Sequence, residues 1–162
     1  MLGPTAPATR GITRRAAALL PLAMLAGGAR AAPATVLATP ASLATALATA
    51  LRARQPLVVM ASLEGCPFCD LVRTNYLGPM QREQALPVVQ LDIGTQRPVL
   101  DFEARASTHD LLLRRWGIQA APTVLFFGPG GHEVAERLVG ASVDFYGAYL
   151  DQRLAAARRH LG

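Results

Sequence analysis

The 162-residue sequence has no lysine, only two cysteines and no apolar run long enough to cross a bilayer. With two cysteines, a zinc site would need two further ligands to complete its tetrahedral coordination. The three histidines, His109, His132 and His160, are scattered and lack the spacing of metal ligands. We therefore expect no resident metal, and any basic segment of the chain must consist of arginine.

Residues 1–31 have the order of a secretory signal peptide. Three arginines lie among residues 10–15, an apolar run covers 16–29, and Ala29-Arg30-Ala31 offers a cleavage site. The run is shorter than the roughly 20 apolar residues that span a bilayer, and Pro21 interrupts it. We expect cleavage, a periplasmic protein and no stable membrane insertion afterwards; an uncleaved anchor is the alternative.

The export route stays open. Arg14-Arg15 is a twin-arginine pair, which is typical of one bacterial export pathway. Because the chain has no lysine, adjacent arginines arise easily by chance, and alanines follow the pair where bulky apolar residues are expected. General secretion and twin-arginine export are therefore equally compatible with the sequence.

The formal net charge of +5 comes almost entirely from the predicted signal peptide. Four of the sixteen arginines precede Ala32, so residues 32–162 carry twelve arginines against eleven acidic residues. A nearly neutral chain lacks the basic surface with which proteins bind nucleic acid. Residues 32–162 are long enough for one domain, and we expect that domain to be a monomer.

Both cysteines lie in Cys66-Pro67-Phe68-Cys69, between an apolar run over 57–61 and a predicted helix. A C-x-x-C at a strand-to-helix junction is typical of thiol–disulfide chemistry. One helical turn brings the two sulfur atoms within bonding reach, and the helix N-terminus favours a thiolate at the first. The pattern predicts a redox-active dithiol. A structural disulfide, which would close a very short loop, and half of a metal site are the alternatives.

Hydrophobic periodicity and turn residues predict the remaining elements. Their β-α-β-α-β-α-β-β-α order predicts an α/β fold with a central mixed sheet flanked by helices on both faces. Residues 94–106 lack periodicity and are expected to form an irregular insertion. The expected strands cover residues 35–38, 57–61, 87–93, 122–127 and 132–139. The first expected helix covers about 40–54 with Thr39 as its N-cap, and the second runs from Cys66 to a break or kink at Gly78-Pro79. A capping box at 107–110 is expected to open a third, short helix. Ser142 is expected to cap the final helix, which carries Phe145, Tyr149, Leu150 and Leu154.

Four segments in the right order make residues 35–158 resemble the thioredoxin superfamily. They are Cys66–Cys69 opening the second helix, Trp116–Thr123 leading to a cis-proline strand, the glycine-rich turn of 128–134, and Val139-Gly140-Ala141 before the last helix. The export signal, the Cys-Pro-Phe-Cys motif, the insertion around Asp101-Phe102 and the closing segment 146–150 are most similar to secreted thioredoxin-related proteins of the SoxW type. The resemblance implies a thioredoxin fold.

The resemblance also implies roles for the residues around the dithiol. Cys66 is the expected attacking thiolate and Cys69 the covered resolving thiol, so the reaction needs no cofactor beyond their disulfide. Pro122 corresponds to the family's cis-proline, and the backbone of Ala121 is expected to pair with an extended client segment. The family's buried aspartate six residues before the first cysteine is here Met60. The residues expected to contact a substrate protein are Pro67, Phe68, Ala121, Pro122 and Gly140.

Glu64 and Asp70 flank the motif, and no cation lies within a helical turn of Cys66 in the sequence. Both acids are expected to oppose a thiolate, which makes a dithiol protein less oxidising. This favours a reductase of protein disulfides with an upstream periplasmic electron donor. Pro67 resembles the proline of oxidases and glutaredoxins, so a disulfide oxidase or isomerase with an electron acceptor is the alternative. A Cu(I) metallochaperone using the same cysteines is the non-enzymatic alternative.

Overall fold

The computed structural model describes residues 1–3, 35–141 and 144–161. The chain divides into two units, Met1–Ala32 and Pro33–Gly162, and the helices and strands described below all belong to the second. The predicted signal peptide (apart from its first three residues) and the predicted cap Ser142 lie outside the described residues and stay predictions. Within the described ranges, no helix has the length and apolar character needed to cross a membrane.

A four-stranded mixed sheet with the order β2-β1-β5-β6 forms the centre of the second unit. β1 pairs in parallel with β2 and antiparallel with β5, and β5 pairs antiparallel with β6. β1 and β5 are buried along their whole length, which accounts for their continuous apolar sequence. The strands are β1 (Leu57–Ser62), β2 (Val88–Asp92), β5 (Thr123–Phe127) and β6 (Glu133–Val139).

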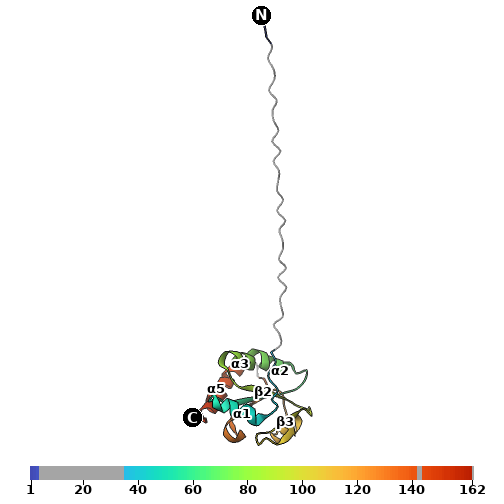
Figure 1. Ribbon diagram of the computed structural model, residues 1–162, viewed down its shortest axis with the longest axis vertical. Helices are drawn as coiled ribbons and strands as arrows, with labels where there is room; N and C mark the ends of the chain where they lie inside the picture. The colour runs from blue at the N-terminus through green and yellow to red at the C-terminus, as the bar shows by residue number, and fades with distance from the viewer. Residues whose placement is uncertain (4–34, 142–143, 162) are drawn as a thin grey trace. The chain divides into compact units, whose positions relative to one another are not determined.

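Helices cover both faces of this sheet, as the sequence predicted (Figure 1). Alternate residues of β1 separate two cores, because successive side chains of a strand point to opposite faces. Val58 and Met60 belong to one core, and Val59 and Ala61 belong to the other. The first core contains side chains of α2 (Pro67–Val72), the π-helical turn η1 (Arg73–Leu77) and α5 (Tyr146–Arg159); the second contains side chains of α1 (Leu43–Arg52) and α4 (His109–Arg115).

The predicted N-caps of two helices are each displaced along the chain. α1 is capped by Ser42 instead of Thr39, because Ala38 and Ser42 form bridges to neighbouring strands and keep the chain between them out of a helix. The same bridge at Ala38 is all that exists of the predicted strand over 35–38. α4 is capped by Thr108, one residue after the predicted Ser107, through a hydrogen bond from a backbone N–H to the threonine hydroxyl.

The segment 94–106 is not irregular, which corrects the prediction. It supplies most of an antiparallel hairpin of β3 (Pro98–Leu100) and β4 (Ala106–Thr108), whose strands are too short to show an alternating pattern. The Asp101 carboxylate accepts hydrogen bonds from the backbone N–H groups of Glu103 and Arg105, at 3.0 and 2.8 Å, and thereby holds the turn. Burial raises the pKa of Asp101, but these bonds and the Arg105 guanidinium outweigh it and leave the pKa lowered.

The helical segment after Cys66 continues from Pro67 to Gln84, so the chain does not break at Gly78-Pro79, where we predicted a break or a kink. Instead η1 precedes α3 (Gly78–Gln84), with Pro79 in the first turn of α3. A π-helical turn changes the hydrogen-bond register, which accommodates a proline that has no N–H to donate. The irregularity begins at Arg73, directly after the turn that carries the cysteines.

Candidate active site

Cys66 and Cys69 form a disulfide at the N-terminus of α2, with their Cα atoms 5.2 Å apart. Cys66 is the N-cap residue, and its Sγ accepts a hydrogen bond from the Cys69 N–H at 3.1 Å. Cys66 is half-buried, whereas Cys69 is fully buried, because the latter lies one turn inside the helix against the core. The arrangement therefore presents one sulfur to solvent and shields the other, as two sequential thiol attacks require.

Strand pairing brings Pro122 and Gly140 to the same end of the sheet as the cysteines. Ala61 of β1 pairs with Thr123 of β5, so Pro122 lies beside the strand end from which the chain leaves toward Cys66. The Ala121-Pro122 peptide bond is cis, as predicted. The Gly140 N–H donates a hydrogen bond to the Pro122 carbonyl at 2.8 Å, which joins the loop after β6 to the cis-proline.

Exposed apolar side chains surround this end of the sheet. Phe68 is 54% exposed and Leu63, in the loop before Cys66, is 48% exposed. Phe145, which we expected on the apolar stripe of the last helix, is 76% exposed; Tyr146 is buried instead and its ring lies 5.0 Å from that of Tyr76. The periodicity of the sequence did not identify Leu63 and Phe145 as surface residues. Each is a single apolar residue beside a turn, and one residue gives no periodic pattern.

Met60, at the position of the family's buried aspartate, packs in the same core cluster as Cys69 and is fully buried. No carboxylate therefore occupies that position to accept a proton from the resolving thiol. Glu64, which flanks the motif in the sequence, lies in the exposed loop before Cys66. Within the described residues, no group of three or more His, Cys, Asp or Glu side chains is arranged to hold a metal ion.

A polar pocket of about 360 Å³ lies beside the dithiol loop. The loop residues Leu63, Glu64 and Gly65 line one part of it, and Arg73 of η1 lines another. Arg73 forms an ion pair with Asp70, so the interpretation of Asp70 as an uncompensated negative charge beside Cys66 is wrong. The sequence did not reveal this cation because it lies seven residues after Cys66 and its long side chain turns back toward α2.

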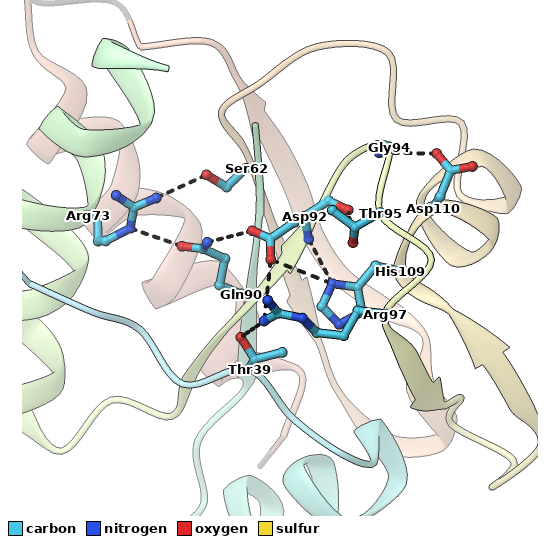
Figure 2. A network of polar contacts seen from close by, with 10 residues as sticks. All are labelled: Thr39, Ser62, Arg73, Gln90, Asp92, Gly94, Thr95, Arg97, His109 and Asp110. Atoms are coloured by element: carbon cyan, nitrogen blue, oxygen red, sulfur yellow. Dashed lines mark hydrogen bonds and ion pairs between the residues drawn. The ribbon is translucent and has the colours of Figure 1, made fainter. Parts of the chain in front are cut away.

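His109 belongs to a network of polar side chains that also includes Arg73, and it contacts Asp92 on the side away from Arg73 (Figure 2). The N–H of Asp92, the last residue of β2, donates a hydrogen bond to His109 Nδ1 at 3.0 Å. The neutral ring therefore carries its proton on Nε2. His109 is fully buried, and Nε2 has no hydrogen-bond partner among the described residues. Burial, aided by Arg97, lowers the pKa of His109 against the opposing effect of Asp92.

The lowered pKa of His109 predicts that acid destabilises the fold. The unfolded chain takes up a proton near the ordinary pKa of 6.5 while the folded chain does not, so the contribution is present above that pH and is lost as pH falls below it. For the uptake of one proton, the free energy of unfolding changes with pH by at most about 1.4 kcal/mol per pH unit. Urea unfolding at neutral pH and at about one and two units below it measures the slope. An unchanged slope in His109→Gln would show that another group is responsible.

A family model described as a thioredoxin-like domain matches residues 43–152. Thiol:disulfide interchange protein DsbD 1 of Pseudomonas aeruginosa is 30% identical over 126 residues, which cover 76% of this chain and 20% of that protein. The chain thus spans about a fifth of the length of this relative.

Among solved structures, thioredoxin NaTrxh from Nicotiana alata is 18% identical, covering 78% of this chain and 99% of that one, with a TM-score of 0.49. The periplasmic thioredoxin SoxS from Paracoccus pantotrophus is 20% identical, covering 64% and 99%, with a TM-score of 0.44. The family match extends over well more than half of the chain and includes the disulfide and the cis-proline. The chain therefore belongs to the thioredoxin-like domain family.

Proposed function

We propose that the protein is exported and reduces disulfides of client proteins in the periplasm, as a secreted thioredoxin-related protein of the SoxW type. One observation carries the proposal: a half-exposed Cys66 and a buried Cys69 share the N-terminus of α2. Export is supported by the signal-peptide pattern of residues 1–31.

The reaction follows from the different exposure of the two sulfurs. The Cys66 thiolate attacks one sulfur of a client disulfide; the client S–S bond breaks, a Cys66–client S–S bond forms, and the released client thiolate takes up a proton. Cys69, once deprotonated, attacks Cys66 Sγ and releases the second client thiolate. Two electrons pass to the client, and the Cys66–Cys69 disulfide remains. An upstream dithiol donor must then reduce it.

The surface around the dithiol favours a protein client over a small thiol. Phe68 and Leu63 offer apolar contact on either side of Cys66, and Pro67 is exposed between the cysteines. Neither backbone group of Ala121 has a hydrogen-bond partner among the described residues, so both are free to pair with an extended client segment. Gly140, whose N–H is bonded to the Pro122 carbonyl, has open space at its Cβ position, because a Cβ atom there would meet nothing within 4 Å.

The direction of electron flow is supported by the charge of Glu64. Its carboxylate lies in the exposed loop next to Cys66 and has no ion-pair partner among the described residues. A nearby negative charge opposes the thiolate and makes the dithiol a better reductant. The ion pair of Asp70 with Arg73 removes the second acid from this argument.

Export and direction are tested together on the protein recovered from the periplasm. We expect an N-terminus near Ala32, catalysed reduction of insulin disulfides, and a Cys66–Cys69 potential closer to that of thioredoxin, about −270 mV, than to the oxidase DsbA, about −120 mV. An intact Met1 would contradict export. A potential near the oxidase value would favour the oxidase alternative, and stoichiometric Cu(I) binding by the reduced protein without insulin reduction would favour the metallochaperone.

A further inference from the structure

Three polar side chains gather on the α2 face of the sheet at the end where the cysteines lie. Strand alternation places Ser62 of β1 and Gln90 and Asp92 of β2 on the same face as Val58, Met60 and Val88, which belong to the core under α2. Ser62 and Asp92 are direct partners across the two strands. The site is therefore a polar patch at the open end of an apolar face.

Arg73 connects this patch to the helix that carries the dithiol. Its guanidinium donates from Nε to Gln90 Oε1 and from Nη2 to Ser62 Oγ, each at 3.0 Å, and its Nη1 pairs with the Asp70 carboxylate. Figure 2 shows the guanidinium joined to both Ser62 and Gln90, with Gln90 in turn hydrogen bonded to Asp92. One planar group is thus held by two strands and by the first turn of α2.

These contacts enclose the loop that delivers Cys66. Ser62 ends β1, the loop of Leu63, Glu64 and Gly65 follows, and Cys66 then caps α2 with its N–H donating to the Leu63 carbonyl at 3.3 Å. Arg73 holds Ser62 before this loop and Asp70 after it. The guanidinium therefore fixes the distance between the two ends of the segment that contains the attacking sulfur.

The charges of this ion pair are unequally exposed to solvent. The Arg73 side chain is 16% exposed, whereas that of Asp70 is 69% exposed. Solvent screens an exposed charge more than a covered one, so the pair leaves a positive potential under the dithiol loop. The other charged groups of the network are Glu64, Asp92, Arg97 and His109; Asp92 faces Arg97 at 3.8 Å, and His109 is neutral when its pKa is lowered.

We propose that Arg73 is a positioning residue for the thiol–disulfide reaction, which clamps the Ser62–Cys66 loop to α2 and offsets the carboxylate of Asp70 beside the Cys66 thiolate. The inference rests on the proposed use of Cys66 as the attacking thiolate. Met60, in the first core, is uncharged and cannot act on the dithiol through a charge. The proposal assigns that function to Arg73 of η1 instead.

The sign of the effect follows from which redox form the charge stabilises. A cation favours the Cys66 thiolate and hence the reduced protein, which makes the couple more oxidising. Removing it in Arg73→Gln should raise the Cys66 pKa, lower the thiolate-to-thiol ratio about three- to tenfold, and shift the glutathione equilibrium toward the oxidised protein. Asp70→Asn should act in the opposite direction. Arg73→Lys keeps the charge and should retain most of the Cys66 pKa.

The experiment measures the Cys66 pKa from thiolate absorbance and the glutathione equilibrium constant in these three variants of the full protein. Arg114→Gln is the matched control, because Arg114 also pairs with an aspartate on its own helix, four residues before it, but lies on α4 with its side chain 76% exposed. We expect no change in that control. Amide hydrogen exchange of Cys66, whose N–H donates to the Leu63 carbonyl across the loop, is followed alongside. We expect it to rise in Arg73→Gln and Arg73→Lys, because an ammonium cannot reproduce the planar contacts.

A merely structural role would give a different result. If Arg73→Gln lowers the stability of the oxidised and reduced forms equally and leaves the Cys66 pKa at its wild-type value, the proposal is overturned. If Arg73→Gln does not fold, Arg73→Lys decides: wild-type exchange of the Cys66 amide in that variant contradicts the clamp. A wild-type protein that fails to reduce insulin, while these pKa shifts appear, refutes the proposed function and leaves the role of Arg73 intact.

Discussion

Cys66→Ser should abolish insulin reduction, whereas Cys69→Ser should accumulate mixed disulfides with client proteins. In the proposed reaction the half-buried Cys66 makes the first attack, and without the buried Cys69 the resulting intermediate has no internal thiol to resolve it. We expect activity at the uncatalysed background in both variants. Non-reducing electrophoresis of acid-quenched cell extracts should show high-mass adducts for Cys69→Ser that a reductant releases.

The Cys66→Ser protein is the matched control for trapping, since it keeps the same helix and one thiol. It should form few adducts, because Cys69 has no exposed surface. In the reduced wild-type protein, iodoacetamide should modify Cys66 much faster than Cys69, as only an accessible thiolate reacts rapidly. Trapping by the Cys66 variant, or equal alkylation of the two thiols, would reverse the assignment of their roles.

Gly131→Ala should destabilise the protein by about 2–5 kcal/mol. Gly131 has a φ of +71°, and a Cβ atom would lie 2.5 Å from Cγ of Phe102. The left-handed conformation costs a side chain about 1–2 kcal/mol, and displacing a packed ring costs about 1–3 kcal/mol more. The ring cannot move freely, because Phe102 packs against Trp116 and Phe127, at centroid distances of 5.8 and 4.7 Å.

Gly117→Ala separates the two contributions. Gly117 has almost the same φ, +70°, but a Cβ atom there would meet nothing within 4 Å. It should therefore cost only the conformational part, about 1–2 kcal/mol. Urea denaturation of the oxidised protein measures both variants. Equal losses would show that the β3–β4 hairpin, whose turn carries Phe102, does not press against Gly131.

The dithiol and the covered sheet could be predicted because their signals are local. A C-x-x-C after an apolar run places two sulfurs on one helical turn, and the continuous apolar strand over 57–61 requires cover on both faces. The cis-proline was predictable only through family resemblance, since nothing local to Ala121-Pro122 distinguishes it. The N-cap of α1 was misplaced because Ala38 and Ser42 pair with distant strands, which local propensity does not register.

Arg73 shows the same limit at the active site. Its distance from Cys66 along the chain suggested no influence on the thiolate, and Asp70 seemed to act without a counter-charge. The side chains that hold Arg73, Ser62 and Gln90, come from two strands separated by the whole α2–α3 segment. Such contacts depend on strand register, because a shift of one residue would turn Gln90 to the other face.

The sequence by itself determined which groups are available for chemistry: two cysteines in a C-x-x-C before a predicted helix, no third thiol for a metal, and a nearly neutral balance of charge over residues 32–162. The tertiary structure decided which groups act on that chemistry. Parallel pairing of β1 with β2 brought Ser62 and Gln90 beneath α2, and antiparallel pairing with β5 brought Pro122 to the cysteines. Reactivity of a thiolate depends on charges and surfaces within a few ångströms, and only the fold sets those distances.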